Sequence, residues 1–167
     1  PSLDLFAQPL LGRYALRLAG MHNAENAIAV IALLDFLRQD ADRVREALAS
    51  FPGTERRFEF IGERFGALCY DDYAHHPEEV RVTLRAFREL FPEKRLTVVF
   101  HPHTFTRTKA LLPEFAQCFT DADRVHLLDI YGSARETQGG VASQDIVDLM
   151  DRFSAGKASV AHDIDAL

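Results

Sequence analysis

The apolar residues in the first third of the chain recur every three to four positions, which is the period of a helix with one buried face. This spacing predicts a helix over His22–Leu37 and a second over Ala41–Phe51, which ends at Pro52-Gly53. Before residue 20 the pattern is weak, and only a short strand near Tyr14–Leu18 is expected. The buried face of the first helix is expected to carry Ala24, Ala27, Ile28, Ile31 and Leu34.

After Gly53 the pattern changes to an alternation of strands and helices. Two short strands come first, at Arg57–Ile61 and Phe65–Tyr70, joined by a turn at Gly62. Further strands are expected at 96–100, 124–130 and 158–161, and helices at 77–90, 106–119 and 143–153. The segment LTVVF (96–100) is apolar at nearly every position, which is typical of a strand buried on both faces of a sheet.

This alternation predicts an α/β fold with a Rossmann-like, three-layer, mostly parallel sheet and helices on both faces. We place the boundary between the helical N-terminal part and the α/β unit so that the two comprise residues 1–54 and 55–167. A chain of 167 residues is long enough to bury a core without disulfide bonds.

Composition excludes several classes of function. The chain has 19 Lys and Arg against 25 Asp and Glu, a net charge of −6, so a basic face for nucleic acid is not expected. No apolar run approaches the 18–20 residues or so of a membrane span. The two cysteines, Cys69 and Cys118, lie in apolar runs and are expected to be buried, reduced thiols of a cytoplasmic protein.

Polar residues gather directly after the expected strands. The segments are Asp71–Pro77, His101–Arg107 and the long loop Tyr131–Gly140. In open parallel sheets, ligands bind beyond the carboxyl ends of the strands, which is where these segments fall. Helix capping explains Pro77 and the two glutamates after it, but not two Asp, one Tyr and two His within six residues.

Two chemistries remain open from the residues alone. His101 and His103, with Asp72 and His75, have ligand types that suit a metal-dependent hydrolase. Arginines near the same rim favour an anion instead, because guanidinium groups bind phosphate and carboxylate in a bidentate manner. These arginines are Arg57, Arg107 and Arg135. A non-enzymatic nucleotide-binding module is a third, weaker interpretation.

Five segments in order resemble the Mur ligases, the ATP-dependent amino-acid ligases of peptidoglycan synthesis. They are GMHNAENAIAVIALL, FPGTERRFEFIG, YDDYAHHPEEVRVTLRAFRE, HPHTFTRTKALLPEFAQCF and LLDIYGSARETQGGVASQDI. The last two are most similar to the L-alanine-adding branch, with the murein tripeptide ligases as the alternative. The resemblance implies that residues 1–54 are the end of a central ATPase domain and that 55–167 are a C-terminal Rossmann-like domain, truncated at its end. No glycine-rich GK[ST] loop is present, so the chain alone is expected to be inactive.

The resemblance also implies substrates, cofactors and residue roles. ATP, with Mg²⁺ held mainly outside these residues, would activate UDP-N-acetylmuramate as an acyl phosphate that the amine of L-alanine attacks. The expected partners are these two substrates and the N-terminal and central domains of the same polypeptide, with neither nucleic acid nor membrane. Implied nucleotide contacts are His22, Asn23, Asn26, Arg57 and Asp72; implied catalytic residues are His75, His76, His103 and Arg107; implied substrate contacts are Tyr73, Tyr131, Arg135 and Glu136; no metal ligand is implied.

Overall fold

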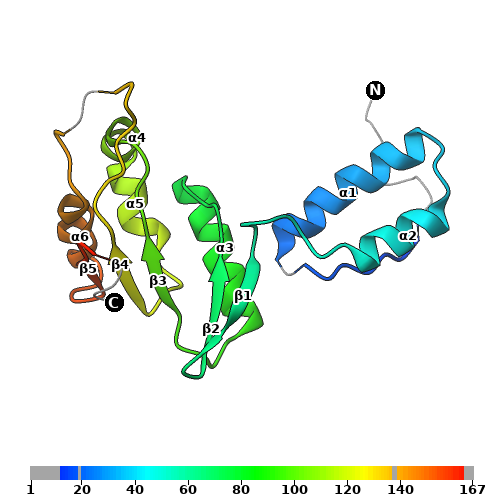
Figure 1. The fold of residues 1–167 in the computed structure, drawn as a ribbon, viewed down its shortest axis with the longest axis horizontal. Helices are drawn as coiled ribbons and strands as arrows, with labels where there is room; N and C mark the ends of the chain where they lie inside the picture. Colours follow the sequence, from blue (N-terminus) through cyan, green and yellow to red (C-terminus); the bar gives the residue numbers. More distant parts are fainter. Residues whose placement is uncertain (1–11, 19, 137–138, 164–167) are drawn as a thin grey trace.

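The computed structural model describes residues 12–18, 20–136 and 139–163 (Figure 1). Two helices come first, α1 (Met21–Phe36) and α2 (Ala41–Ser50), close to their predicted bounds. The strand expected near 14–18 is wrong, since these residues form no regular element. Expectations for residues 1–11 and 164–167, and for 137–138 within the long loop, lie outside the described part.

The helix α1 buries less of its surface than its pattern predicted. Ala27 and Ile31 are buried, but Ile28 is 64% exposed and Phe36 is 82% exposed. The prediction that Ile28 points inward is therefore wrong for the described residues. The physical reason is that α1 is apolar on nearly all sides, and α2 covers only one of them.

The strands β1 (Glu59–Arg64) and β2 (Ala67–Asp71) form an antiparallel hairpin. Its turn lies at Phe65-Gly66, where both residues have positive φ angles of 51° and 78°, and not at Gly62 as predicted. Gly62 instead lies inside β1 at a bulge, with φ at 145°. Glycine takes this conformation without steric cost, which a bulge and a turn can both use.

The α/β unit follows as predicted, with a parallel sheet in the order β3–β4–β5. Its strands are β3 (Thr97–Phe100), β4 (Arg124–Leu127) and β5 (Ala158–Val160), and its helices are α3 (Pro77–Leu90), α4 (Phe105–Ala110), α5 (Leu112–Cys118) and α6 (Ser143–Asp151). Neighbouring helices contact each other in the order α3, α5, α6. For α5 and α6, which join consecutive parallel strands, this is expected when both crossovers have one hand.

The single helix predicted over 106–119 is two helices in the structure. Leu111 ends α4 and precedes α5, with φ at −114° and ψ at 24°. Pro113 lies in the first turn of α5, where its missing N–H is tolerated. A continuous helix would need that N–H, so the chain restarts at this point.

The core lies between the sheet and these helices. Phe115, Phe119, Leu127 and Ile146 are almost completely buried in it. Cys118 is buried there as predicted, and burial raises the pKa of its thiol to about 12. No helix among the described residues is long and apolar enough to cross a membrane.

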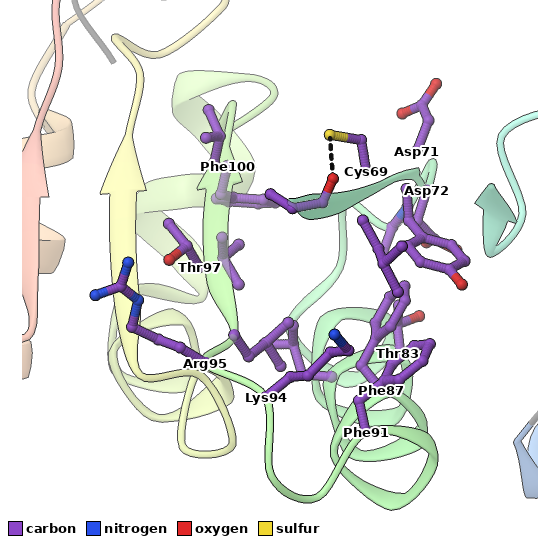
Figure 2. Close-up of a pocket in the computed structure, with 18 of the residues that line it drawn as sticks. Cys69, Asp71, Asp72, Thr83, Phe87, Phe91, Lys94, Arg95, Thr97 and Phe100 are labelled. Atoms are coloured by element: carbon purple, nitrogen blue, oxygen red, sulfur yellow. Dashed lines mark hydrogen bonds between the residues drawn. The ribbon is translucent and has the colours of Figure 1, made fainter. Parts of the chain in front are cut away.

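The strand β3 is less buried than predicted, because it pairs with β4 on one edge only. Val99 is 46% exposed, and a pocket of about 760 Å³ separates β3 from β2 (Figure 2). Figure 2 shows Phe87 and Phe91 of the α3 segment along one side of this pocket. Cys69 also lines it and is partly exposed, which corrects the expectation that both cysteines are buried.

Candidate functional site

Polar side chains from two of the predicted segments meet in a small cavity. Its volume is about 90 Å³, and Tyr73, His75, His103 and Arg107 line it. The first two residues follow β2 and the last two follow β3, so the ends of these two strands place the four side chains together. This position agrees with the rule that ligands bind beyond the carboxyl ends of strands.

Asp72 anchors the segment that follows β2. One oxygen of its carboxylate accepts a hydrogen bond from the backbone N–H of Phe58 and the other from that of Ala74, both at 2.8 Å. The N–H of Tyr73 donates to the carbonyl of Arg56 at 2.7 Å. Asp72 therefore joins the hairpin to the segment that carries Tyr73 and His75, and its contact with a ribose stays a prediction.

His75 is oriented by its own backbone neighbours. Its Nδ1 lies 3.0 Å from the carbonyl oxygen of Tyr73, and a carbonyl only accepts, so Nδ1 carries the proton. The Nε2 of the neutral ring is then left with a free lone pair. His76 instead caps α3, where its Nδ1 accepts from the N–H of Glu78 at 3.3 Å.

Glu79 was expected only as a first-turn carboxylate of the helix, but it also supports His75. Its Oε2 accepts from the backbone N–H groups of His75 and His76 at 3.0 and 3.2 Å. Burial opposes the charge of this carboxylate, yet these two donors and its electrostatic interactions with nearby His75 and Arg57 lower its pKa. Glu79 is thus an anion next to His75, and its sequence signal was the spacing of a capping box.

The turn after β3 is held in an uncommon conformation. Thr104 has φ at 71° and ψ at 131°, a region that a β-branched residue rarely adopts and that costs on the order of 1–3 kcal/mol. Its N–H donates to the carbonyl of Tyr131 at 2.9 Å, and its own carbonyl accepts from the hydroxyl of buried Thr108 at 2.8 Å. The surrounding structure therefore fixes Thr104 from both sides.

The predicted third segment reaches the site by pairing with this turn. Tyr131 and His103 form an isolated parallel β-bridge, and their rings are stacked with centroids 4.7 Å apart. Arg135 is exposed, and its side chain forms no hydrogen bond or ion pair within the described part of the chain. Of the three predicted residues in this loop, Tyr131 and Glu136 thus contact the turn after β3.

Glu136 makes more hydrogen bonds than any other carboxylate of the site. Oε1 accepts from the backbone N–H groups of Phe105 at 3.1 Å and Ser133 at 2.8 Å. Oε2 accepts from the N–H of Thr106 at 3.0 Å and from its hydroxyl at 2.9 Å. These donors, the N–H of Thr106 foremost, lower the pKa of Glu136 to about 2, so it is an anion at neutral pH.

Arg107 brings a positive charge to the cavity. Partial burial, and after it the charges of His101, Arg107, His75 and Arg56, lower the pKa of His103. Within the described residues, the Arg107 guanidinium forms neither a hydrogen bond nor an ion pair with another side chain. An arginine that lines a cavity without an internal counter-ion suits a carboxylate or phosphate ligand.

Arg56 is a site residue that the sequence did not single out. Its Nε lies 3.1 Å from a carboxylate oxygen of Asp71, and its guanidinium carbon lies 4.9 Å from the ring centroid of Tyr73. Arg56, held by Asp71, thereby keeps the ring of Tyr73 at the edge of the cavity. The available signal was the Arg56-Arg57 pair before the hairpin, which by itself is common on solvated surfaces.

None of the predicted nucleotide contacts lines the cavity, although Asp72 directly precedes Tyr73 and anchors its segment. His22, Asn23 and Asn26 are at the start of α1, which comes close to Ala86 of α3 next to Gly20. No group of three or more His, Cys, Asp or Glu within the described ranges is arranged to hold a metal ion. His75 and His103 share the cavity, but the described residues supply no third ligand of these types beside them for a metal-dependent hydrolase.

Comparison with known proteins identifies close relatives. A profile of the family described as "Mur ligase, glutamate ligase domain" matches residues 56–167. The chain is 46% identical over 144 residues to the UDP-N-acetylmuramate–L-alanine ligase of Desulfitobacterium hafniense, which covers 86% of this chain and 32% of the relative. It is 49% identical over 140 residues to the same ligase of Anaeromyxobacter, which covers 84% and 30%.

Solved structures agree with the sequence relatives. The chain superposes on the UDP-N-acetylmuramate-alanine ligase MurC of Thermotoga maritima with a TM-score of 0.73 and 32% identity, which covers 89% of this chain and 31% of that one. A murein peptide ligase of Psychrobacter arcticus gives a TM-score of 0.65 at 25% identity, over 92% and 31%. The chain thus spans about a third of the length of the relatives that it matches.

Proposed function

The chain belongs to the Mur ligase family, and from this premise we propose that it is the C-terminal part of an ATP-dependent ligase that joins L-alanine to UDP-N-acetylmuramate. The proposal is supported by the relatives near 46–49% identity, which carry that name. We further propose that residues 1–54 are the end of the ATP-binding domain. The match of the family profile begins at residue 56, in agreement with this division.

The observation that carries the proposal is the guanidinium of Arg107, which lines the small cavity and has no ion-pair partner among the described residues. Arg107 can hold the carboxylate of an amino acid with its guanidinium fork, and Tyr73 can add a hydrogen bond from its hydroxyl. A cavity of about 90 Å³ suits a small amino acid. Binding through the carboxylate leaves the amine of L-alanine free to react.

The reaction follows from this orientation. ATP transfers its γ-phosphoryl group to the carboxylate of UDP-N-acetylmuramate, which gives ADP and an acyl phosphate. The amine nitrogen then attacks the acyl carbon, the bond from that carbon to the phosphate oxygen breaks, and phosphate leaves with the electron pair. The amine loses a proton, for which Nε2 of His75 is a suitable acceptor, because Nδ1 already carries its proton.

The nucleotide and metal roles are assigned by the family resemblance. Under this proposal His22, Asn23 and Asn26 contact the adenine, and Asp72 and Arg57 contact the ribose and phosphates. The described residues offer no cluster of carboxylates or imidazoles for Mg²⁺, so we assign Mg²⁺ to none of them. His76 is the weakest of the proposed catalytic residues, since its ring already caps α3.

The test is Arg107→Ala in the complete ligase that contains these residues, with ADP release measured while each substrate is varied in turn. Losing charge-assisted hydrogen bonds worth about 1.5–3 kcal/mol should raise the KM for L-alanine roughly 10- to 150-fold, with the KM for ATP little changed. Arg124→Ala is the matched control, because Arg124 lies at the start of β4, at the other end of the parallel strands.

A defect confined to ATP, or an unchanged kcat/KM for L-alanine, would place the amino-acid site elsewhere. ADP release that depends on a murein tripeptide instead of L-alanine would transfer the same chemistry to the tripeptide ligases. No ADP release by the wild-type ligase with any amino acid would refute the proposed function itself.

A further inference from the structure

The turn that carries His103 and Arg107 has two local contacts, since the hydroxyl of Thr104 accepts from the N–H of Arg107 at 3.4 Å and its carbonyl accepts from the hydroxyl of Thr108, but its backbone conformation is strained. Thr104, between them, has a positive φ of 71° that its β-branched side chain disfavours. An isolated turn of this sequence would relax to negative φ and move the neighbouring side chains. Whatever keeps Thr104 in place therefore also decides where His103 and Arg107 point.

The loop from Tyr131 to Glu136 makes the contacts that could do this. At its start, the carbonyl of Tyr131 accepts from the N–H of Thr104, and its N–H donates to the carbonyl of Pro102. At its end, the carboxylate of Glu136 accepts from Phe105 and Thr106, the two residues after the turn. The loop therefore forms hydrogen bonds with the turn on both sides of Thr104.

We propose that Glu136 is the positioning residue of this site: its carboxylate holds the turn at Thr104 in the conformation that directs His103 and Arg107 into the cavity. The consequence for catalysis rests on the function proposed above. Glu136 accepts four hydrogen bonds from the protein itself and does not line the cavity. It acts on the substrate through His103 and Arg107 and without direct contact.

Both oxygens of Glu136 are needed for this role. Each oxygen accepts two hydrogen bonds, one pair from Phe105 and Ser133 and the other pair from Thr106. In Glu136→Gln one oxygen becomes an NH₂ group, which cannot accept from a backbone N–H. Glu136→Gln should therefore be intermediate between the wild type and Glu136→Ala, where all four are lost.

The first experiment needs no substrate. In the 167-residue chain, NMR should show contacts between the stacked rings of His103 and Tyr131. Glu136→Ala should weaken these contacts and shift the ring signals of His103. Adding Thr104→Gly should restore part of them, because glycine adopts the positive φ without strain, although it also removes the hydroxyl that accepts from the N–H of Arg107.

The second experiment measures ADP release by the complete ligase. Glu136→Ala should raise the KM for L-alanine about tenfold or more and leave the KM for ATP unchanged. Glu136→Ala with Thr104→Gly should return that KM to within about threefold of the wild type. Asp145→Ala is the matched control: its carboxylate accepts from the N–H of Ala142 at the start of α6, and its loss should leave both KM values unchanged.

The outcomes separate this inference from the proposed function. Unaltered His103 signals in Glu136→Ala, or the same kinetic loss with and without Thr104→Gly, would overturn the positioning role. The latter result would mean that Glu136 contacts the substrate directly. If the wild-type ligase has no alanine-dependent activity, the proposed function fails, and the NMR experiment still decides the role of Glu136.

Discussion

The ring of His103 combines two features that a ligand-binding imidazole needs: it lies at the cavity, and its surroundings disfavour the charged form. Partial burial is the largest cause of its lowered pKa, and the charges of His101 and Arg107 follow. At neutral pH this ring is therefore unprotonated and can accept a hydrogen bond from an ammonium group. Under the proposed function, Arg107 is the cation that attracts the carboxylate of the amino acid.

We predict that NMR titration of the 167-residue chain gives His103 a pKa below 6.5, and that Arg107→Ala raises it part of the way back. We expect the pKa of His103 to stay below 6.5 in this variant, because the partial burial and the charge of His101 remain. Arg124→Ala, at the far end of the sheet, should leave the titration unchanged. A His103 pKa at or above 6.5 in the wild type, or no response to Arg107→Ala, would contradict the electrostatic description of the cavity.

The lowered pKa of His103 also determines how the free energy of unfolding changes with pH. The unfolded chain binds a proton to His103 at a higher pH than the folded chain does, so protonation favours unfolding. His103 therefore reduces the free energy of unfolding as the pH falls through about 6.5. For Glu136 the sign is reversed: its stabilising effect is present above the unfolded pKa and is lost as the pH falls toward about 2.

Among the secondary-structure elements, α5 and β4 provide the support on which the site rests. Phe115 of α5 is completely buried, in contact with the core that includes Phe100 at the end of β3. Phe100 directly precedes the turn that carries His103. Packing beneath β3 thus fixes the base of that turn, while the loop from Tyr131 to Glu136 fixes its far side.

Phe115→Ala should lower the free energy of unfolding by about 3–5 kcal/mol, because it removes buried apolar surface and leaves a cavity. Urea denaturation of the 167-residue chain measures this. Phe65→Ala is the matched control, since Phe65 is 96% exposed in the hairpin turn, and its loss should change stability by less than about 0.5 kcal/mol. Equal effects of the two substitutions would mean that the core is not where the structure places it.

At the level of the whole molecule, the chain is about a third of the length of its relatives. We propose above that its cavity orients an amino acid, but its sequence contains no glycine-rich GK[ST] loop to hold the phosphates of ATP. We predict that the purified 167-residue chain releases no ADP with L-alanine and UDP-N-acetylmuramate, and that the complete ligase does. Alanine-dependent ADP release by the homogeneous chain would contradict the inference that ATP is held by residues outside it.

Local sequence rules predicted the elements well wherever short-range effects decide them. The helix predicted over 77–90 has those bounds in the structure, because Pro77 and the capping residues define its start. The helix predicted over 106–119 is interrupted because Pro113 favours the first turn of a new helix. This proline was visible in the sequence, but the helical spacing of the apolar residues led to the prediction of one continuous helix. The hairpin turn was predicted at Gly62 because glycine is common in turns, but glycine is equally suited to the β-bulge that the structure has there.

By itself, the sequence determined that this is an α/β protein of the Mur ligase family and which segments carry its polar residues. The fold class and the polar segments follow from periodicity and capping along the chain, whereas the family was inferred from the resemblance of five segments to the Mur ligases. Only the tertiary structure decided which of those polar residues meet. Tyr73, His75, His103 and Arg107 share one cavity, whereas Glu136 is saturated by the turn that it holds. Such pairings join residues about 30 positions apart, and their geometry is set by how strands and loops pack rather than by any local pattern.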